Sequence, residues 1–235
     1  TGVDDFVRDG AIAYSITVGV AASSDLIYNG VDPNDVSVTN TDNDVRGVTV
    51  SPVAGLVTTE AGGTATFTVV LTSQPTANVT IPMSSSNAGE GTVAPASVTF
   101  TAGNWNVAQS VTVTGVNDFV QDGPVAYTIA LSPITSSDPV YSGWNPADVA
   151  VSNTDDDAAG VTVTPVAGLV TTEAGGTATF TVVLTSRPTA NVVIPLSSNN
   201  PAEGTVAPAS VTFTAANWNV AQTLTVTGVN DFVQD

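Results

Sequence analysis

The stretch TATFTVVLTS, at Thr64–Ser73 and again at Thr177–Ser186, decides the fold class of this chain. In the first copy, Phe67, Val69 and Leu71 alternate with threonines and valine, so that large apolar side chains fall on one face. Alternation with a period of two residues is typical of a β-strand with one buried face. The stretch therefore predicts a strand that packs its Phe, Val and Leu side chains into a core.

The same alternation recurs in several other short runs. These are Val98 with Phe100, Val111 with Val113, Val125 with Tyr127, Ile129 and Leu131, and Val149 with Val151. Turn-forming pairs such as Gly62-Gly63 and Gln74-Pro75 separate the runs. Short strands at such spacing predict an all-β fold of tandem, immunoglobulin-like (Greek-key) antiparallel sandwiches with seven to eight strands each.

The strand pattern belongs to a long internal repeat. VAGLVTTEAGGTATFTVVLTS begins at Val53 and again at Val166, which sets a period of 113 residues (166 − 53). TGVNDFVQD begins at Thr114 and Thr227 with the same period, and the variant TGVDDFVRD begins at Thr1. Solenoid units have periods of about 20–50 residues, whereas a sandwich domain needs about 100. Each period is therefore expected to be one domain.

The phase of the repeat predicts three domain segments. Residues 1–46 are the C-terminal part of one domain, residues 47–159 a complete domain, and residues 160–235 the N-terminal part of a third. We expect a window from a longer array, since no signal peptide is visible. Alternatively, 160–235 of one chain is completed by 1–46 of the next. Thr1–Asp9 and Thr227–Asp235 would compete for one position in such an assembly. This competition favours a chain that is a segment of a longer array, and completion by the next chain stays open as the alternative.

The charge of the chain excludes several kinds of partner. Twenty-one Asp and Glu stand against three Lys and Arg, for a net charge of −18. Such a chain repels nucleic acid, itself a polyanion, and favours cations. No apolar run reaches the ~18–20 residues of a membrane span, so no membrane insertion is expected in this segment. With no Cys and no His, a metal site would have only oxygen ligands, which suit Ca²⁺, Mg²⁺ or Mn²⁺.

The acidic residues recur at the same positions of each repeat and are not scattered over the sequence. Glu60 recurs as Glu173 and Glu90 as Glu203, and these are the only glutamates. Most of the aspartates concentrate in the NDFVQD segment, in the closing run TDDD, and in a loop that carries Asp138 and Asp148. One interpretation is that acidic linkers keep the protein soluble. The regular recurrence favours the other, a site for a divalent cation, most simply Ca²⁺, which takes ~6–8 oxygen ligands.

The chain resembles the Calx-beta domain family over its whole length, as repeats of large bacterial surface or adhesin proteins. The resemblance lies in the opening VTVSP, the glutamate after the first strand, TFTAGNWNVAQSVTVTGVND and the closing Asp run. It implies Ca²⁺ ligands at Glu60, in the hairpin and in the closing run, with Glu90 as a further acid in a mid-domain loop. Asn117 stands where the family has Asp, which implies weaker binding or fewer ions.

Across all copies, the resemblance and the repeat together give one set of candidate metal ligands. In the complete domain they are Glu60, Glu90, Asn117, Asp118, Asp122, Asp155, Asp156 and Asp157. In the first copy they are Asp4, Asp5, Asp9, Asp42 and Asp44, and in the third they are Glu173, Glu203, Asp231 and Asp235.

The function expected from these features is structural. The chain is interpreted as a repeat module of an extracellular bacterial surface protein, forming a calcium-stiffened stalk, adhesin or fibre. Its partners would be neighbouring repeats and other copies in a fibre. The alternative is a glycan- or surface-binding module, with Trp105 and Trp218 as a stacking platform, although a repeated Trp in a sandwich is more often core. An enzyme is not expected, because no His, Lys or Cys is present to act as base or nucleophile.

Overall fold

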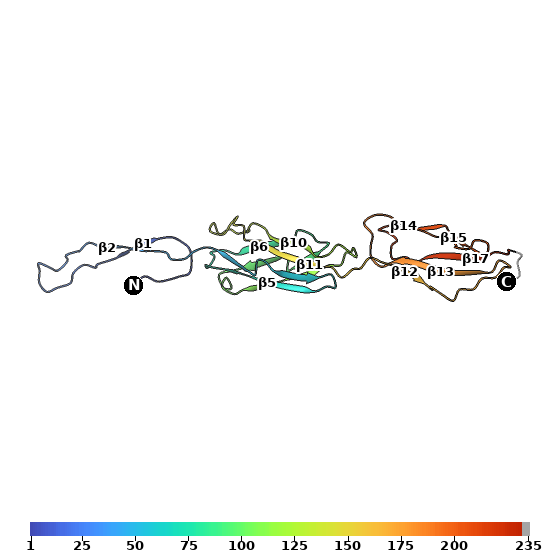
Figure 1. The fold of residues 1–235 in the computed structure, drawn as a ribbon. Coiled ribbons are helices and arrows are strands. Elements are labelled where there is room, and N and C mark those ends of the chain that lie inside the picture. The colour runs from blue at the N-terminus through green and yellow to red at the C-terminus, as the bar shows by residue number, and fades with distance from the viewer. Residues whose placement is uncertain (232–235) are drawn as a thin grey trace. The chain divides into compact units, whose positions relative to one another are not determined.

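The computed structural model describes residues 1–231 and contains only strands as regular secondary structure in that range (Figure 1). The strands are β1 (Ile12–Ile16), β2 (Val36–Asn40), β3 (Val48–Ser51), β4 (Leu56–Thr59), β5 (Thr64–Leu71), β6 (Val79–Ser85), β7 (Gly91–Ala94), β8 (Ser97–Phe100), β9 (Gln109–Gly115), β10 (Val125–Leu131), β11 (Val149–Thr154), β12 (Val161–Thr164), β13 (Thr177–Leu184), β14 (Val192–Pro195), β15 (Gly204–Ala207), β16 (Ser210–Phe213) and β17 (Gln222–Gly228). Among the described residues there is no helix that could span a membrane.

Contacts between Cα atoms divide the chain into two units. Unit 1 comprises Thr1–Val57, Thr64–Thr114 and Ala126–Ser152. Unit 2 comprises Thr58–Gly63, Gly115–Val125 and the described part of Asn153–Asp235. The last residues of β4, β9 and β11 and the segments that follow them therefore belong to unit 2.

Strands β3 to β11 form a two-sheet sandwich. One sheet has the order β3-β5-β9-β7 and the other the order β4-β11-β10-β6-β8. The all-β, immunoglobulin-like prediction is confirmed. Nine strands replace the expected seven to eight, because the opening segment forms β3 in one sheet and β4 in the other. Pro52, which has no N–H to donate, follows the end of β3, and Gly55 takes a φ of 79° before β4 begins.

The core of the middle sandwich follows from the alternation in the sequence. Phe67, Val69 and Leu71 of β5 are at most 3% exposed. They pack in one cluster with the inward residues of the other strands: Val79, Ile81, Met83, Val98, Phe100, Val111, Val113, Tyr127, Ile129, Leu131, Val149 and Val151. Large side chains of this kind stabilise by about 1.5–3 kcal/mol each when fully buried. The predicted rows of inward residues are thus the residues that hold the sandwich together.

Two smaller structures flank these strands in the sequence. The antiparallel pair β1 and β2 forms a hairpin with Tyr14 opposite Val38. The strands β12 to β17 form one sheet of order β12-β13-β17-β15 and a second sheet of β14 and β16. Val182, Leu184, Val211, Phe213 and Leu224 are the buried residues of this second core.

Candidate metal centre

Backbone hydrogen bonds bring Glu60 to the acidic run. Glu60 lies directly after β4, and its N–H donates to the carbonyl oxygen of Thr154, the last residue of β11, at 3.0 Å. A second, buried hydrogen bond joins the same two strands: the Thr58 hydroxyl of β4 donates to Oδ1 of Asn153 in β11 at 2.9 Å. Asn153 Nδ2 in turn donates to the carbonyl of Val116, the residue before the NDFVQD segment. All these residues belong to unit 2.

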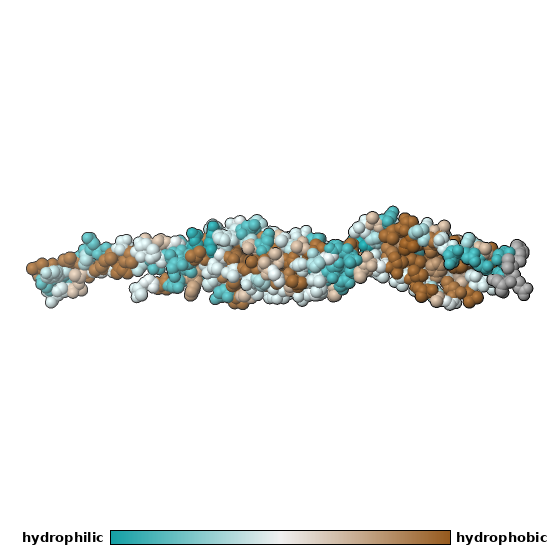
Figure 2. Space-filling view, viewed as in Figure 1, coloured by the Kyte–Doolittle hydropathy of each residue, from teal (hydrophilic) through white to brown (hydrophobic). Residues whose placement is uncertain are grey.

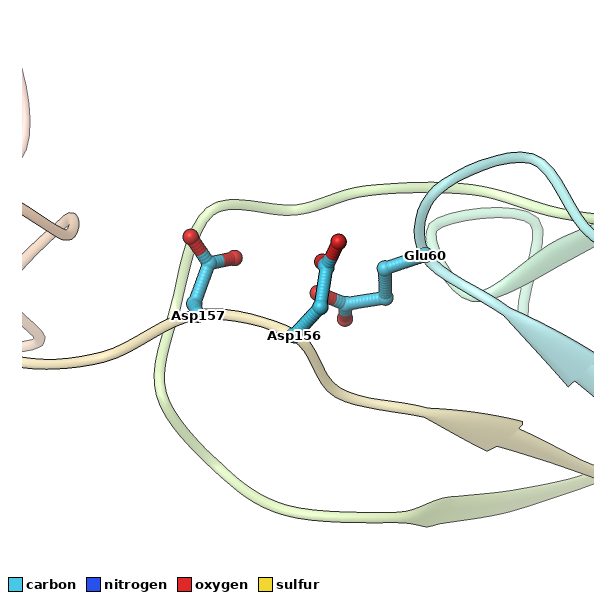
Figure 3. Close-up of side chains that lie close together, drawn as sticks. All are labelled: Glu60, Asp156 and Asp157. Atoms are coloured by element: carbon cyan, nitrogen blue, oxygen red, sulfur yellow. The ribbon is translucent and has the colours of Figure 1, made fainter.

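Glu60, Asp156 and Asp157 form the centre of the candidate site. One carboxylate oxygen of each lies within 4.8 Å of the others. Figure 3 shows Glu60 reaching from the loop after β4 toward the segment after β11, which carries the two aspartates. Glu60 is 4% exposed, and its Oε2, like Oδ2 of Asp157, is buried without a hydrogen-bond partner. Buried carboxylate oxygens left unsatisfied are costly, and a cation between them would remove that cost.

The electrostatics of the cluster reflect the crowding of like charges. Burial raises the pKa of Glu60 to about 7, with further contributions from a hydrogen bond to Asp157 and from the charges of Asp118, Asp155 and Asp157. Burial also raises the pKa of Asp157. The same is true of Asp122, where the charges of Asp118 and Asp155 add to the effect of burial. The charge of Asp156 also acts on Asp157. Six aspartates and glutamates from three segments therefore act on one another, which is the condition in which a divalent cation is favoured.

Asp155 has a different role from its neighbours. Its Oδ2 accepts hydrogen bonds from the N–H groups of Asp122 and Gly123 at 3.0 and 2.7 Å, and its Oδ1 accepts from the N–H of Asp157 at 2.7 Å. These bonds, led by the one from Gly123, lower the pKa of Asp155. The side chain thus stays ionised and ties the 115–125 segment to the acidic run.

Asn117 and Asp118 shape the segment that carries them. Asn117 Oδ1 accepts from the N–H of Phe119 at 2.6 Å, and Asp118 Oδ1 accepts from the N–H of Val120 at 2.7 Å. Phe119 has a φ of 65°, a left-handed conformation that non-glycine residues rarely adopt. Its ring lies 5.8 Å from the Trp218 ring, and its carbonyl accepts from the N–H of Arg187 at 2.6 Å. The residue pattern of the segment carries no signal for these contacts, because they depend on residues far along the chain.

The first copy of the site repeats part of this arrangement within unit 1. Asp42 accepts from the N–H groups of Gly10 and Asp44 at 2.8 and 2.7 Å, as Asp155 does in the second copy. Burial raises the pKa of Asp44, with help from the charges of Asp4, Asp42, Asp5 and Asp9. These acids line a hollow of about 390 Å³. Among residues 1–231, however, they do not converge on a buried glutamate in the way that Asp156 and Asp157 converge on Glu60.

The remaining candidates differ in their burial. Glu90 is buried in unit 1, with its N–H donating to the carbonyl of Asn87 at 3.1 Å. Glu173 and Glu203 are exposed, and Asp231 is half-buried. Asp235 lies outside the described residues. The two repeated tryptophans, Trp105 and Trp218, are half-buried against the cores of their repeats.

Comparison with solved structures finds β-sandwich proteins of low sequence identity. The chain is similar to the calcium binding domain CBD12 of CALX1.1, with 17% identity over 78% of this chain and 76% of that one, at a TM-score of 0.37. It is similar to domains 4 and 5 of the S-layer protein SbsC, with 18% identity over 66% and 82%, at 0.31. SSP-19 of Caenorhabditis elegans, an MSP-domain protein like family member, matches at 17% identity over 46% and 99%, with a TM-score of 0.35.

No protein-family model matches the chain, and no curated protein sequence matches it. The fold therefore follows from this chain's own strand order, and the chemistry of the site from its own acids.

Proposed function

We propose that the chain is a structural repeat module of an extracellular bacterial surface protein, and that it binds Ca²⁺ at the centre formed by Glu60, Asp156 and Asp157. Asp118, Asp122 and Asp155 would supply further oxygens or negative charge. The observation that carries the proposal is the buried, unpaired Oε2 of Glu60 within reach of two aspartates from another segment. A buried carboxylate without a partner calls for either a proton or a cation.

The ligand chemistry favours a hard cation. Every candidate ligand is a carboxylate or amide oxygen, since the chain has no Cys and no His. Ca²⁺ accepts an irregular shell of ~6–8 oxygens at about 2.3–2.6 Å, whereas Mg²⁺ demands near-octahedral geometry at shorter distances. The candidate ligands come from three loop segments and are Glu and Asp side chains of different length. Such an irregular set suits Ca²⁺ better than Mg²⁺.

The structural role follows from what the cation would join. The loop after β4, the 115–125 segment and the run after β11 would share one ion. In the same unit, the 115–125 segment contacts Trp218 and Arg187 of the C-terminal repeat. Binding would thus fix the segment between repeats, which is useful in a stalk or fibre at the cell surface, where extracellular calcium modules bind at about 10⁻⁴–10⁻³ M.

The glycan-binding alternative has less support. A stacking platform needs an exposed aromatic face, but Phe6 lies over Trp105 at 6.1 Å and Phe119 over Trp218 at 5.8 Å. The guanidinium of Arg46 lies 4.6 Å from the centre of the Trp144 ring. The three tryptophan rings therefore already have partners within the chain. We propose no catalytic role, because the clustered aspartates and glutamates are proposed to bind the cation.

The proposal is tested by removing and restoring the ion. The 235-residue chain is stripped with a chelator, dialysed, and titrated with Ca²⁺ by calorimetry and by thermal melting, with Mg²⁺ as the comparison ion. Saturable binding and a melting temperature that rises with Ca²⁺ are expected. At a hundred times the dissociation constant, mass action would add ~2.7 kcal/mol of stability per site. An unchanged melting temperature together with no binding heat would overturn the proposal.

A further inference from the structure

Two phenylalanines one period apart have the same unusual backbone conformation. Phe6 has a φ of 64° and Phe119 a φ of 65°. Among the described residues, 1–231, they are the only ones other than glycine with a positive φ. A bulky side chain is strained in this left-handed region. Such strain persists only where the surrounding structure imposes it, and it clusters at functional sites.

A side chain two residues earlier holds each phenylalanine in this conformation. Oδ1 of Asn117 accepts from the N–H of Phe119 at 2.6 Å. In the first copy, Oδ1 of Asp4 accepts from the N–H of Phe6 at 3.4 Å. Asn and Asp are the residues that form such turns with the backbone two positions on. Each turn therefore presents a phenylalanine ring in a defined place.

Each phenylalanine ring lies against a tryptophan of the following repeat. The ring centres of Phe6 and Trp105 are 6.1 Å apart, with an angle of 38° between their planes. For Phe119 and Trp218 the values are 5.8 Å and 39°. The first pair lies within unit 1 and the second within unit 2. Tilted ring pairs with centres about 4.5–7 Å apart attract each other beyond the effect of the area they bury.

A backbone hydrogen bond accompanies each ring pair. The carbonyl oxygen of Phe6 accepts from the N–H of Gln74 at 2.7 Å, and that of Phe119 accepts from the N–H of Arg187 at 2.6 Å. Gln74 and Arg187 occupy the same position of the repeat (187 − 74 = 113). Because the bond uses backbone atoms, the change from Gln to Arg leaves it in place. The two copies thus make the same contact despite different side chains at the donor.

The tryptophans are fixed to the sandwiches on which the phenylalanines rest. Trp105 packs against the core of the middle repeat and Trp218 against that of the C-terminal repeat. The carbonyl oxygen of Trp105 accepts from the N–H of Leu71, the last residue of β5, at 3.1 Å. The carbonyl oxygen of Trp218 accepts from the N–H of Leu184, the last residue of β13, at the same distance. A ring that contacts either tryptophan is therefore tied to the body of a repeat.

Exposure alone does not identify a docking residue in this chain. Figure 2 shows hydrophobic residues on the surface along the chain. Phe119 is 49% exposed, and Val107, which has no such contacts among the ring pairs, is 58% exposed. What distinguishes Phe6 and Phe119 is that a strained backbone, a ring pair and a backbone hydrogen bond coincide at one residue.

We propose that Phe6 and Phe119 are docking residues that each hold the next repeat of the chain, and that this joint forms without calcium. The partner surface is a tryptophan ring together with one backbone N–H. None of the docking atoms is a carboxylate oxygen, so the joint goes beyond the proposed function and does not rest on it. Calcium would act on the acidic residues of the same segment and add to a contact that is already made.

The first test follows the tryptophan indole N–H signals by NMR in excess chelator. The chain has three tryptophans and therefore three such signals, which single Trp→Phe variants assign. Phe119→Gly removes the ring, and glycine accepts a positive φ without strain. The Trp218 signal should therefore shift while the Trp105 signal stays. Phe6→Gly should give the opposite result, and neither variant should move the Trp144 signal.

The two glycine variants control for each other, because a general loss of folding would move all three signals. Phe119→Tyr keeps the ring and should leave the Trp218 signal close to its original position. Signals that move in neither glycine variant would overturn the proposed contact. If Phe119→Gly changed the Trp218 signal only after Ca²⁺ is added, the joint would depend on calcium and the proposal would be wrong.

The second test asks whether the contact couples the repeats in chelator. Nitrogen-15 relaxation gives a rotational correlation time for each repeat. The middle and C-terminal repeats of the unaltered chain should share one long correlation time, and Phe119→Gly should split it into two shorter ones. Val107→Gly, on an exposed valine outside the contact, should behave as the unaltered chain. Equal correlation times in all three chains would overturn the coupling, whereas a missing calcium response with an intact joint would contradict only the proposed function.

Discussion

The N–H of Glu60 donates to the carbonyl oxygen of Thr154 at 3.0 Å, and this one hydrogen bond places a buried glutamate beside three successive aspartates. The two residues are far apart in sequence and meet because β4 and β11 are neighbours in the sheet. The consequence is a centre in which charge, burial and unsatisfied oxygens coincide.

Replacing Glu60 with glutamine should abolish most of the calcium-dependent rise in melting temperature. The substitution removes a carboxylate whose unpaired oxygen is buried in the cluster, beside the likewise unpaired Oδ2 of Asp157. If Ca²⁺ contributes ~2.7 kcal/mol at a hundred times its dissociation constant, the lost shift is on the order of 10 °C for a domain of this size. Calorimetric melting with and without chelator measures it.

Glu173→Gln is the matched control for that variant. Glu173 sits in the same local sequence one period later but is exposed. Its substitution should leave the calcium response intact. A calcium response that survives Glu60→Gln and is lost in Glu173→Gln would place the ion elsewhere.

Without calcium, stability should fall as pH rises from about 4.5 to about 7. The pKa of Glu60 is raised from 4.5 to about 7, chiefly by burial and then by its acidic neighbours. The folded state therefore binds the proton more tightly than the unfolded state, so the stabilisation is present below 4.5 and lost as pH passes through 7. Denaturant melts across this range in chelator should show the decline, and Glu60→Gln should flatten it. Saturating Ca²⁺ should also flatten it, because the ion binds the ionised form.

Replacing Asn117 with aspartate should strengthen calcium binding by about fivefold. An aspartate can keep the 2.6 Å hydrogen bond from the N–H of Phe119 while adding a negative charge beside Asp118. A unit charge at about 4 Å is worth ~1 kcal/mol in a water-like dielectric, which corresponds to that factor. Isothermal titration of the two chains compares the affinities. Asn104→Asp makes the same chemical change at another turn, where Asn104 Oδ1 accepts from the N–H of Thr101 at 2.6 Å, and should not alter the affinity.

Replacing Gly115 with alanine should destabilise the middle repeat by about 1–3 kcal/mol. A Cβ on this buried glycine would clash with the carbonyl oxygen of Thr59 and with Oδ1 of Asn153. Because Thr59 precedes Glu60, the forced shift should also weaken calcium binding. Urea denaturation measures the first effect and titration the second. Gly103→Ala serves as control, since the nearest atom to its added Cβ is Thr101 Oγ1 at 3.8 Å; a similar loss there would show that the clash is not the cause.

Local patterns in the sequence predicted much of the sandwich. The alternation in Thr64–Ser73 predicted that Phe67, Val69 and Leu71 would be buried, and the structure confirms it. Strand periodicity is a local property, since successive side chains of an extended chain point to opposite faces. The recurrence of acids suggested a cation site, and its ligand set stays a prediction. That Asn117 would orient Phe119 toward Trp218 could not be predicted, because it depends on a left-handed backbone conformation and on a neighbour far along the chain.

The segment LVTT occurs twice, at Leu56–Thr59 and at Leu169–Thr172, and separates what the sequence determines from what the tertiary structure decides. The first copy is β4 and pairs with β11, while the second forms no strand in the described residues. Glu60 after the first copy is 4% exposed, whereas Glu173 after the second is exposed to solvent. Sequence alone set the composition, the period and the apolar faces. Burial and charge coupling at Glu60 came only with the neighbouring strand, because a sheet's hydrogen bonds and desolvation need a partner that the local sequence does not contain.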